Sequence, residues 1–125
     1  AALEHTLAYV RERKAFGKAV IEFQNTQFKI AEMHTKLEVA RAYVDRCLEL
    51  HLKKELDIPT AAAAKYYITD LQCEVIDECV QLHGGYGYMW EYPVARMFAD
   101  SRVQRIYGGT NEIMKTIIAK AVLAD

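Results

Sequence analysis

The chain has 125 residues, a formal net charge of −1, and a composition that is 52% hydrophobic and 26% charged. That length is enough for one domain with a single core, and the composition excludes an intrinsically disordered chain. Basic residues are scattered among acidic ones, which argues against a nucleic-acid-binding protein. No apolar run approaches the roughly 20 residues that span a bilayer. No signal-peptide pattern stands at the start, so we expect neither a transmembrane segment nor secretion.

The amino-terminal part predicts a helix over residues 2–13 that ends near Gly17. The sequence opens on AALEHTLAYVRERKAFG, which is already in helical period and has no initiator Met. We therefore expect the chain to be the carboxy-terminal fragment of a longer protein, cut through a helix.

Two long helices follow. From about residue 25 to 52, apolar side chains recur at intervals of three and four, as on one face of a helix: Ile30, Met33, Leu37, Ala40, Val44 and Cys47. Pro59 suits the first turn of the next helix, which runs to His83 and is ended by Gly84. Its apolar face carries Ala64, Ile68, Leu71, Val75, Cys79 and Leu82.

The last third predicts a loop over 84–93, a shorter helix over about 94–105, and a final helix that begins at Thr110 or Asn111. We expect the final helix to bury Ile113, Ile117 and Ala121. No stretch alternates convincingly with a period of two, so no strand is predicted. Four to five helices with short connections favour a single all-α domain over residues 1–125, an up-and-down four-helix bundle.

Three cysteines lie inside the helical patterns, and their odd number favours reduced thiols in a cytoplasm-like compartment. Cys79 and His83 are four residues apart and can share a helix face. A zinc site usually needs three or four ligands, and no second pair stands at a useful spacing. We therefore predict core thiols and surface histidines, and no metal site.

Most catalytic motifs are absent. The chain has a single serine, Ser101, and neither a nucleophile elbow nor a Cys/His/Asn pattern. The glycines of GGYGY follow a helix rather than a strand, and they lack the Lys-Ser/Thr ending of a phosphate loop. Taken alone, this stretch is typical of a loop that ends a helix.

Three segments nevertheless combine residue types that suit a large, flat, anionic ligand. In ERKAFGKAVIEFQ, Arg13 offers a fork of donors suited to a phosphate or pyrophosphate, near Phe16 and Gln24. In QLHGGYGYMWEYP, Gln81 precedes a glycine pair whose backbone can lie flat against a ligand. In IYGGTNEI, a helix mouth offers N–H groups to an anion. Simpler interpretations exist: a surface salt bridge for Arg13, and packing at a bundle end for the aromatic residues.

At these segments the sequence resembles the carboxy-terminal helical domain of the acyl-CoA dehydrogenase family. The motifs RKAFGK followed by Gln24, QLHGGYGY…EYP, and IYGGTNEI occur in the family's order and spacing over essentially the whole chain. The nearest types by resemblance are the long-chain and isovaleryl ones. The resemblance implies a three-domain flavoenzyme that uses FAD to convert an acyl-CoA to the trans-2-enoyl-CoA, in fatty-acid or branched-chain catabolism. It implies a mitochondrial matrix or a bacterial cytoplasm as the location.

Residue by residue, the resemblance implies two sets of site residues. The implied FAD-binding residues, some of which act across a subunit boundary, are Arg13, Phe16, Gln24, Gln81, Gly84, Gly85, Thr110, Asn111 and Glu112. The implied floor of the acyl-thioester pocket consists of Tyr107, Gly108 and Gly109. The implied partners are an acyl-CoA substrate, copies of the same chain in a dimer or a dimer of dimers (a homotetramer), and an electron-transfer flavoprotein.

Gly108 departs from the commonest family pattern, YEGT, in which a glutamate base follows the tyrosine. In the long-chain and isovaleryl types the base comes from an earlier helix, which by resemblance precedes Ala1. We therefore expect no catalytic residue in this chain and no activity from it alone. Two alternatives stay open. One is a family member with another reaction, such as nitroalkane or acyl-CoA oxidation; the other is an oligomerisation or interaction module whose chemistry has lapsed.

Overall fold

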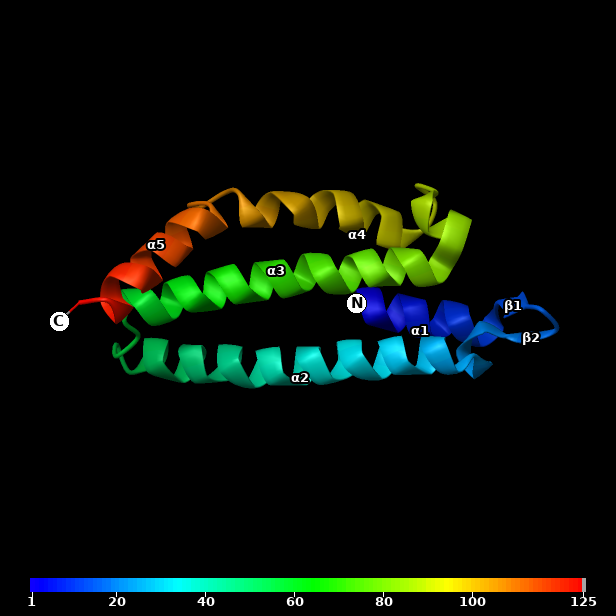
Figure 1. Ribbon diagram of the computed structural model, residues 1–125, viewed down its shortest axis with the longest axis horizontal. Helices are drawn as coiled ribbons and strands as arrows, with labels where there is room; N and C mark the ends of the chain where they lie inside the picture. The colour runs from blue at the N-terminus through cyan, green and yellow to red at the C-terminus, as the bar shows by residue number, and fades with distance from the viewer. Residues whose placement is uncertain (125) are drawn as a thin grey trace.

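The computed structural model describes residues 1–124 and is almost entirely helical (Figure 1). The helices are α1 (Ala2–Glu12), α2 (Gln24–Leu52), α3 (Ile58–His83), α4 (Pro93–Ser101) and α5 (Asn111–Val122). Three short 3-10 turns connect them: η1 (Val20–Glu22), η2 (Gly84–Tyr88) and η3 (Arg102–Arg105). Two short antiparallel strands, β1 (Lys14–Ala15) and β2 (Lys18–Ala19), form a hairpin.

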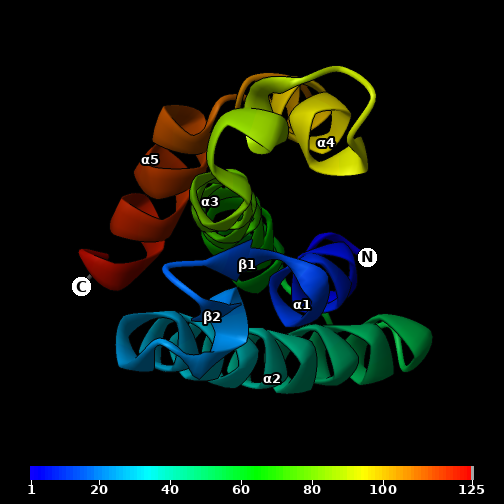
Figure 2. The ribbon, with the colours of Figure 1, turned by 90° about the vertical axis from the view of Figure 1, so that its right-hand side faces the viewer.

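Helix α3 is the centre of the bundle. Helices α1, α2, α4 and α5 are arranged around it (Figure 2), and each packs against it. Helix α2 runs antiparallel to α3, and α4, η3 and α5 together return along α3 as one interrupted helix (Figure 1). The predicted all-α, up-and-down four-helix bundle is therefore confirmed, with its fourth helix broken in two.

The core forms where the predicted apolar faces of α2 and α3 meet. Its buried members are Met33, Ala40, Leu71, Val75, Cys79 and Val94. The first five belong to the predicted stripes at three- and four-residue spacing, so the helical period placed most of the core correctly. Val94 adds the packing face of α4.

The ends of α3 follow the local signals in the sequence. Its N-cap residue, Asp57, accepts a hydrogen bond from the Thr60 backbone N–H at 2.7 Å, and this bond lowers the pKa of the Asp57 carboxyl. Pro59 occupies the first turn. At the other end, Gly84 has a φ of 59°, a conformation that side-chain-bearing residues rarely adopt.

Three sequence-based expectations were wrong in detail. A hairpin of two-residue strands forms at 14–19, because the predicted glycine turn reverses the chain tightly enough for backbone pairing. The segment 84–93 contains a 3-10 turn, and α4 ends at Ser101 with η3 completing the segment. Finally, Ile113 is 52% exposed and Ala121 is also exposed.

The packed face of α5 is rotated from the predicted one. Asn111 is buried, and Met114, Ile117 and Ile118 are half-buried, at the spacing of one helix face. The helix is rotated because the polar side chain of Asn111 is buried. The pattern of hydrophobic residues gives no sign that this polar residue faces the core. Among residues 1–124, no helix combines the length and apolar character needed to cross a bilayer.

Candidate functional site

The first two of the three predicted segments, around Arg13 and around Gln81, lie together at the end of the bundle where α1 and α3 both end. A pocket of about 580 Å³ lies there. Its lining residues are Tyr9, Arg13, Val20, Gln81, Leu82, His83, Gly84, Gly85, Tyr86 and Met89. Four of the nine predicted cofactor-binding residues thus share one hollow, although they come from two distant parts of the chain.

An aromatic cluster holds the glycine bend of this pocket. The Tyr9 ring stacks on the His83 ring with centroids 4.3 Å apart, and the Tyr9 hydroxyl donates to the His83 carbonyl oxygen at 3.2 Å. Tyr92 meets both rings edge-on, at centroid distances of 6.1 Å. Burial raises the pKa of the Tyr9 hydroxyl and lowers the pKa of the His83 imidazole. Tyr9 and His83 are therefore both uncharged near pH 7.

Arg13 provides the positive charge of the pocket. Its guanidinium lies over the Tyr86 ring, 5.2 Å from the centroid. Among the described lining residues it is the one that carries a full charge when His83 is neutral. A planar group with five donors suits a phosphate or pyrophosphate.

The glycine pair leaves backbone open beside that charge. A Cβ atom added at Gly84 or at Gly85 would meet nothing within 4 Å. Gly84 also has a backbone conformation, φ 59° and ψ −141°, that favours glycine. This stretch of main chain is therefore open to the close approach of a flat ligand.

Phe16 and Gln24 are near this end of the bundle but do not line the pocket. Phe16 has a φ of 51° in the turn between β1 and β2, is 98% exposed, and meets the Phe23 ring edge-on at 6.3 Å. A large side chain in a left-handed conformation without burial is strained, and such residues cluster at binding sites. Gln24 begins α2 and is exposed.

The last predicted segment forms a separate region on the side of α3. Thr110, not Asn111, is the N-cap of α5, because its hydroxyl accepts from the Ile113 N–H at 3.3 Å. Asn111 is only 3% exposed and its side chain points into the protein, whereas Glu112 and Tyr107 are exposed. Gly108 and Gly109 have φ values of 62° and 91°.

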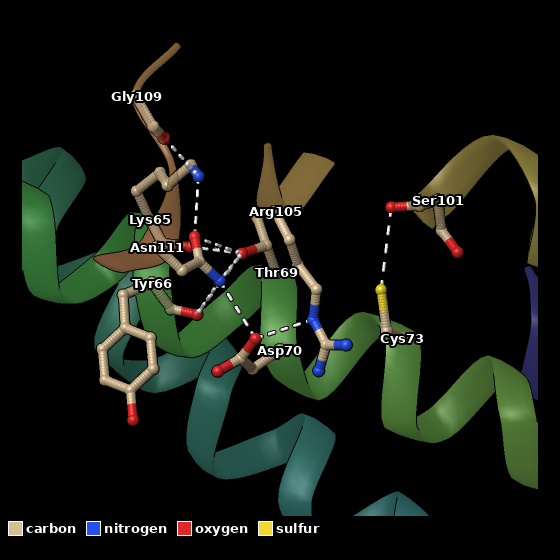
Figure 3. Close-up of polar contacts among 9 residues, drawn as sticks. All are labelled: Lys65, Tyr66, Thr69, Asp70, Cys73, Ser101, Arg105, Gly109 and Asn111. Atoms are coloured by element: carbon tan, nitrogen blue, oxygen red, sulfur yellow. Dashed lines mark hydrogen bonds and ion pairs between the residues drawn. The ribbon is translucent and has the colours of Figure 1, made fainter. Parts of the chain in front are cut away.

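A polar network surrounds Asn111 (Figure 3). Its side-chain oxygen accepts from the Lys65 ammonium at 2.7 Å, and its amide nitrogen donates to Thr69 Oγ1 and to Asp70 Oδ1, both at 3.0 Å. Lys65 also donates to the Gly109 carbonyl oxygen at 2.8 Å. Arg105 Nε lies 2.7 Å from Asp70 Oδ1 as an ion pair without hydrogen-bond alignment.

The two regions do not meet within one chain. The network contacts α3 at Lys65–Asp70, whereas the pocket contacts its end at Gln81–His83. Asp70 and Gln81 are eleven positions apart in α3. At 1.5 Å of rise per residue, that spacing is roughly 16 Å along the helix axis. In the single chain the predicted site residues thus lie in two separate regions, which would be two half-sites rather than one continuous site.

The structure gives no support to metal chemistry within the described chain. No group of three or more His, Cys, Asp or Glu side chains is positioned to share an ion among residues 1–124. Cys79 and His83 do share a helix turn, but the His83 Nδ1 atom hydrogen-bonds to the Cys79 carbonyl oxygen at 2.8 Å. All three cysteines are free thiols. Contrary to the surface position expected for it, His83 is buried.

The residues that support the pocket and the Asn111 network were not predicted from the sequence. In the sequence alone, nothing distinguishes the polar residues Lys65 and Asp70, or the aromatic Tyr9, from other members of amphipathic helices. A weak signal existed for Lys65 and Thr69, which are four apart and therefore share a helix face, beside the apolar one. Their partner Asn111 lies more than 40 positions away in the sequence, and no local pattern reports such a pairing.

The family described as "Acyl-CoA dehydrogenase, C-terminal domain" matches residues 1–123. The long-chain specific acyl-CoA dehydrogenase of Rattus norvegicus mitochondria is 57% identical over 122 residues, covering 98% of this chain and 28% of that protein. The caffeyl-CoA reductase-Etf complex subunit CarC of Acetobacterium woodii is 41% identical over 98% of this chain and 32% of its own length.

The fold is also that of solved relatives. The crystal structure of the acyl-CoA dehydrogenase from Geobacillus kaustophilus superposes with a TM-score of 0.95 and 46% sequence identity, covering 98% of this chain and 32% of that chain. The chain thus spans between about a quarter and a third of the length of these relatives.

Proposed function

This chain belongs to the acyl-CoA dehydrogenase family as its carboxy-terminal domain, and we propose that it forms part of an FAD-dependent dehydrogenase. The proposed reaction removes two hydrogens from an acyl-CoA thioester and gives the trans-2-enoyl-CoA. One observation carries the proposal: the pocket in which Arg13, Gln81, Gly84 and Gly85 come together. FAD would supply the redox chemistry, and the protein would supply position and electrostatics.

The chemistry of this pocket fits the pyrophosphate side of FAD. A guanidinium fork, an amide side chain and an open glycine backbone are donors of the kind that bind phosphate oxygens. The volume, about 580 Å³, falls in the usual range for cofactor sites. Exposed Phe16 and Gln24 would complete the adenosine side.

The second half-site, Thr110 to Glu112, would contact FAD through the backbone and the exposed groups of its helix mouth, because the Asn111 side chain points into the protein. The two half-sites are separated along α3, so a neighbouring copy of the chain would bring its own half-site to an FAD bound at the first. We therefore propose a dimer or a dimer of dimers with FAD at the subunit boundary. Large exposed apolar side chains on α2, including Phe28, Leu48 and Leu52, support burial against further protein.

The exposed turn of Tyr107, Gly108 and Gly109 would be the floor of the acyl-thioester pocket. Gly108 cannot abstract a proton, so we propose that the base stands on a helix that continues α1 before Ala1. An apolar groove of about 480 Å³ supports this arrangement, because it joins Ala1 to Gln104 of η3, close to the turn. The chain by itself would then be inactive.

The partners follow from the same proposal. The reduced flavin would be reoxidised by an electron-transfer flavoprotein, as the name of the Acetobacterium woodii relative, a subunit of an Etf complex, suggests for that protein. The enzyme would act in a mitochondrial matrix or a bacterial cytoplasm. Acyl chain length depends on parts of the pocket outside this domain.

The test is an assay of the full-length protein, purified with its flavin. Acyl-CoA substrates of graded length are mixed with an artificial electron acceptor, and formation of enoyl-CoA is followed. Arg13→Ala should lower the FAD content, whereas replacing Arg11, an exposed arginine in the last turn of α1, by Ala should not. A colourless protein that takes up no added FAD would refute the proposal.

A second reading within the family concerns the direction and type of the reaction. The Acetobacterium woodii relative is named a reductase, which favours testing enoyl-CoA reduction alongside dehydrogenation. Activity with oxygen, or with a nitroalkane in place of a thioester, would identify the alternative reactions. Bound FAD without any of these activities would favour a module whose chemistry has lapsed.

A further inference from the structure

The turn that carries Tyr107, Gly108 and Gly109 is held at both of its ends by one helix. On the entering side, Arg105 of η3 pairs with Asp70 of α3 at 2.7 Å. On the leaving side, the Gly109 carbonyl accepts from Lys65 of α3 at 2.8 Å. Figure 3 shows the two attachments side by side on α3.

Asn111 joins the two attachments into one network. It accepts from Lys65 at 2.7 Å and donates to Asp70 Oδ1 at 3.0 Å, the same oxygen that Arg105 approaches. The network therefore runs from the positive ammonium of Lys65 through the polar amide of Asn111 to the negative carboxylate of Asp70. It ends at the positive guanidinium of Arg105. We call Lys65, Asn111, Asp70 and Arg105 the turn clamp.

Lys65 makes an unusual choice of partners in this clamp. The ion pairs among residues 1–124 do not include it, and its ammonium donates to two neutral oxygens, Gly109 O and Asn111 Oδ1. Charge-assisted hydrogen bonds of this kind are about twice as strong as neutral ones. Among the described residues, the charged ammonium of Lys65 thus orients a backbone carbonyl and forms no ion pair with an acidic side chain.

The turn itself has little stiffness of its own. Gly108 and Gly109 both have positive φ, and an added Cβ at Gly108 would meet nothing within 4 Å. Two consecutive glycines lose much conformational entropy on ordering, so an outside attachment is needed to keep one geometry. Lys65 supplies it from the rigid central helix.

We propose that Lys65 is a positioning residue for the reaction, because it fixes the floor of the acyl-thioester pocket through the Gly109 carbonyl. This inference rests on the proposed function of the Tyr107–Gly109 turn. Displacing a reacting group by about 1 Å can cost on the order of 100-fold in rate. The effect should therefore fall more on kcat than on FAD binding, because Lys65 contacts the second half-site at Asn111 but not the pyrophosphate pocket.

The test compares Lys65→Met with Lys65→Arg in the full-length holoprotein, with exposed Lys120→Met on α5 as the matched control. Lys65→Met keeps an unbranched apolar stem but removes all donors. We expect kcat to fall about 10- to 100-fold, with a smaller loss of FAD content, because the pyrophosphate pocket is untouched, and with KM for acyl-CoA within about threefold. Lys65→Arg, which keeps charge and donors, should lose less, and Lys120→Met should match the parent protein.

Hydrogen exchange gives a readout that does not depend on activity. In Lys65→Met the amides of residues 106–112 should exchange about tenfold faster or more, while those of 79–88 stay as in the parent protein. Should Lys65→Met fail to fold, Lys65→Gln, which keeps a neutral donor, replaces it in both measurements.

The outcomes separate the two proposals. Unchanged exchange over 106–112, or a lower melting temperature with a parental kcat for the folded enzyme, overturns the positioning role. A parent protein that holds FAD but does not oxidise acyl-CoA refutes the proposed reaction. In that protein, faster local exchange in Lys65→Met would still support the clamp.

Discussion

The chain contains two glycine pairs, Gly84–Gly85 and Gly108–Gly109, and the protein stabilises them in different ways. Both pairs follow a helical segment and both contain positive φ angles. The first lies against stacked aromatic rings with a buried, neutral imidazole. The second is tied to α3 by an ammonium, an amide, a carboxylate and a guanidinium.

The two glycine pairs thus look alike in the sequence, but different kinds of interaction stabilise them in the folded protein. The first pair depends on exclusion of water, so its weak point is protonation of a buried group. The second depends on hydrogen bonds to buried polar atoms, so its weak point is the loss of one partner, which leaves the others unsatisfied. Four substitutions separate these mechanisms.

The largest effect should come from removing the centre of the clamp. Asn111→Ala removes the shared partner of buried Thr69 and of half-buried Lys65 and Asp70. We expect the free energy of unfolding to fall by about 2–3 kcal/mol, measured by urea denaturation. Exposed Asn25→Ala on α2 is the control and should change little. Equal losses in the two variants would mean that the network adds no stability.

A second effect tests the close packing behind the first pair. A Cβ atom at buried Gly87 would lie 2.4 Å from the Val80 carbonyl oxygen. Because backbone must move to relieve that clash, Gly87→Ala should cost about 2 kcal/mol, seen as a lower midpoint of thermal unfolding. Gly85→Ala is the matched control, since nothing lies within 4 Å of its added Cβ. A Gly87→Ala protein as stable as Gly85→Ala would contradict the packing.

A third effect concerns pH. Burial lowers the pKa of His83 in the folded state, so below the unfolded value of about 6.5 the unfolded chain binds more protons. Stability should therefore fall as pH drops from about 6.5 toward the folded pKa, with a slope of at most about 1.4 kcal/mol per pH unit. His83→Phe keeps a ring against Tyr9 and should flatten this part of the profile.

The control for this pH effect is exposed His34→Phe, which should leave the slope intact. Stability is measured by urea denaturation between pH 5.5 and 7.5. If the His83→Phe profile parallels that of the parent protein, the aromatic cluster is not the pH-sensitive element.

The smallest effect should be that of Arg13 on stability. Its guanidinium is exposed and lies over Tyr86, and exposed contacts of this type contribute about 0.5–1 kcal/mol. Arg13→Ala should therefore unfold within about 1 kcal/mol of the parent protein, even while FAD retention falls. A loss of several kcal/mol would make Arg13 a structural residue of the hairpin end instead.

Much of the fold was predictable because its signals are local. The stripes through Met33, Ala40, Leu71 and Val75 lie at helical spacing, and single residues encode the start of α3 (Pro59) and its end (Gly84). The hairpin at 14–19 was missed because two-residue strands show no alternation. The face of α5 was misjudged because buried Asn111 overrides the apolar period.

The site was predictable only as a set of residue types. Arg13, Gln81 and the glycine pair were singled out for their chemistry, and the pocket brings those four together. The supporting residues Tyr9, His83 and Lys65 were not found as such, because each acts on a partner far away in the sequence.

Neighbouring residues encode the five helices, both ends of α3, the apolar stripes of α2 and α3 and the family motifs, since periodicity, capping and motif order are local properties. Only the tertiary structure decided that one glycine pair rests on neutral aromatic rings and the other on a charged clamp. Such support depends on which distant side chains meet, and on how much water their meeting excludes.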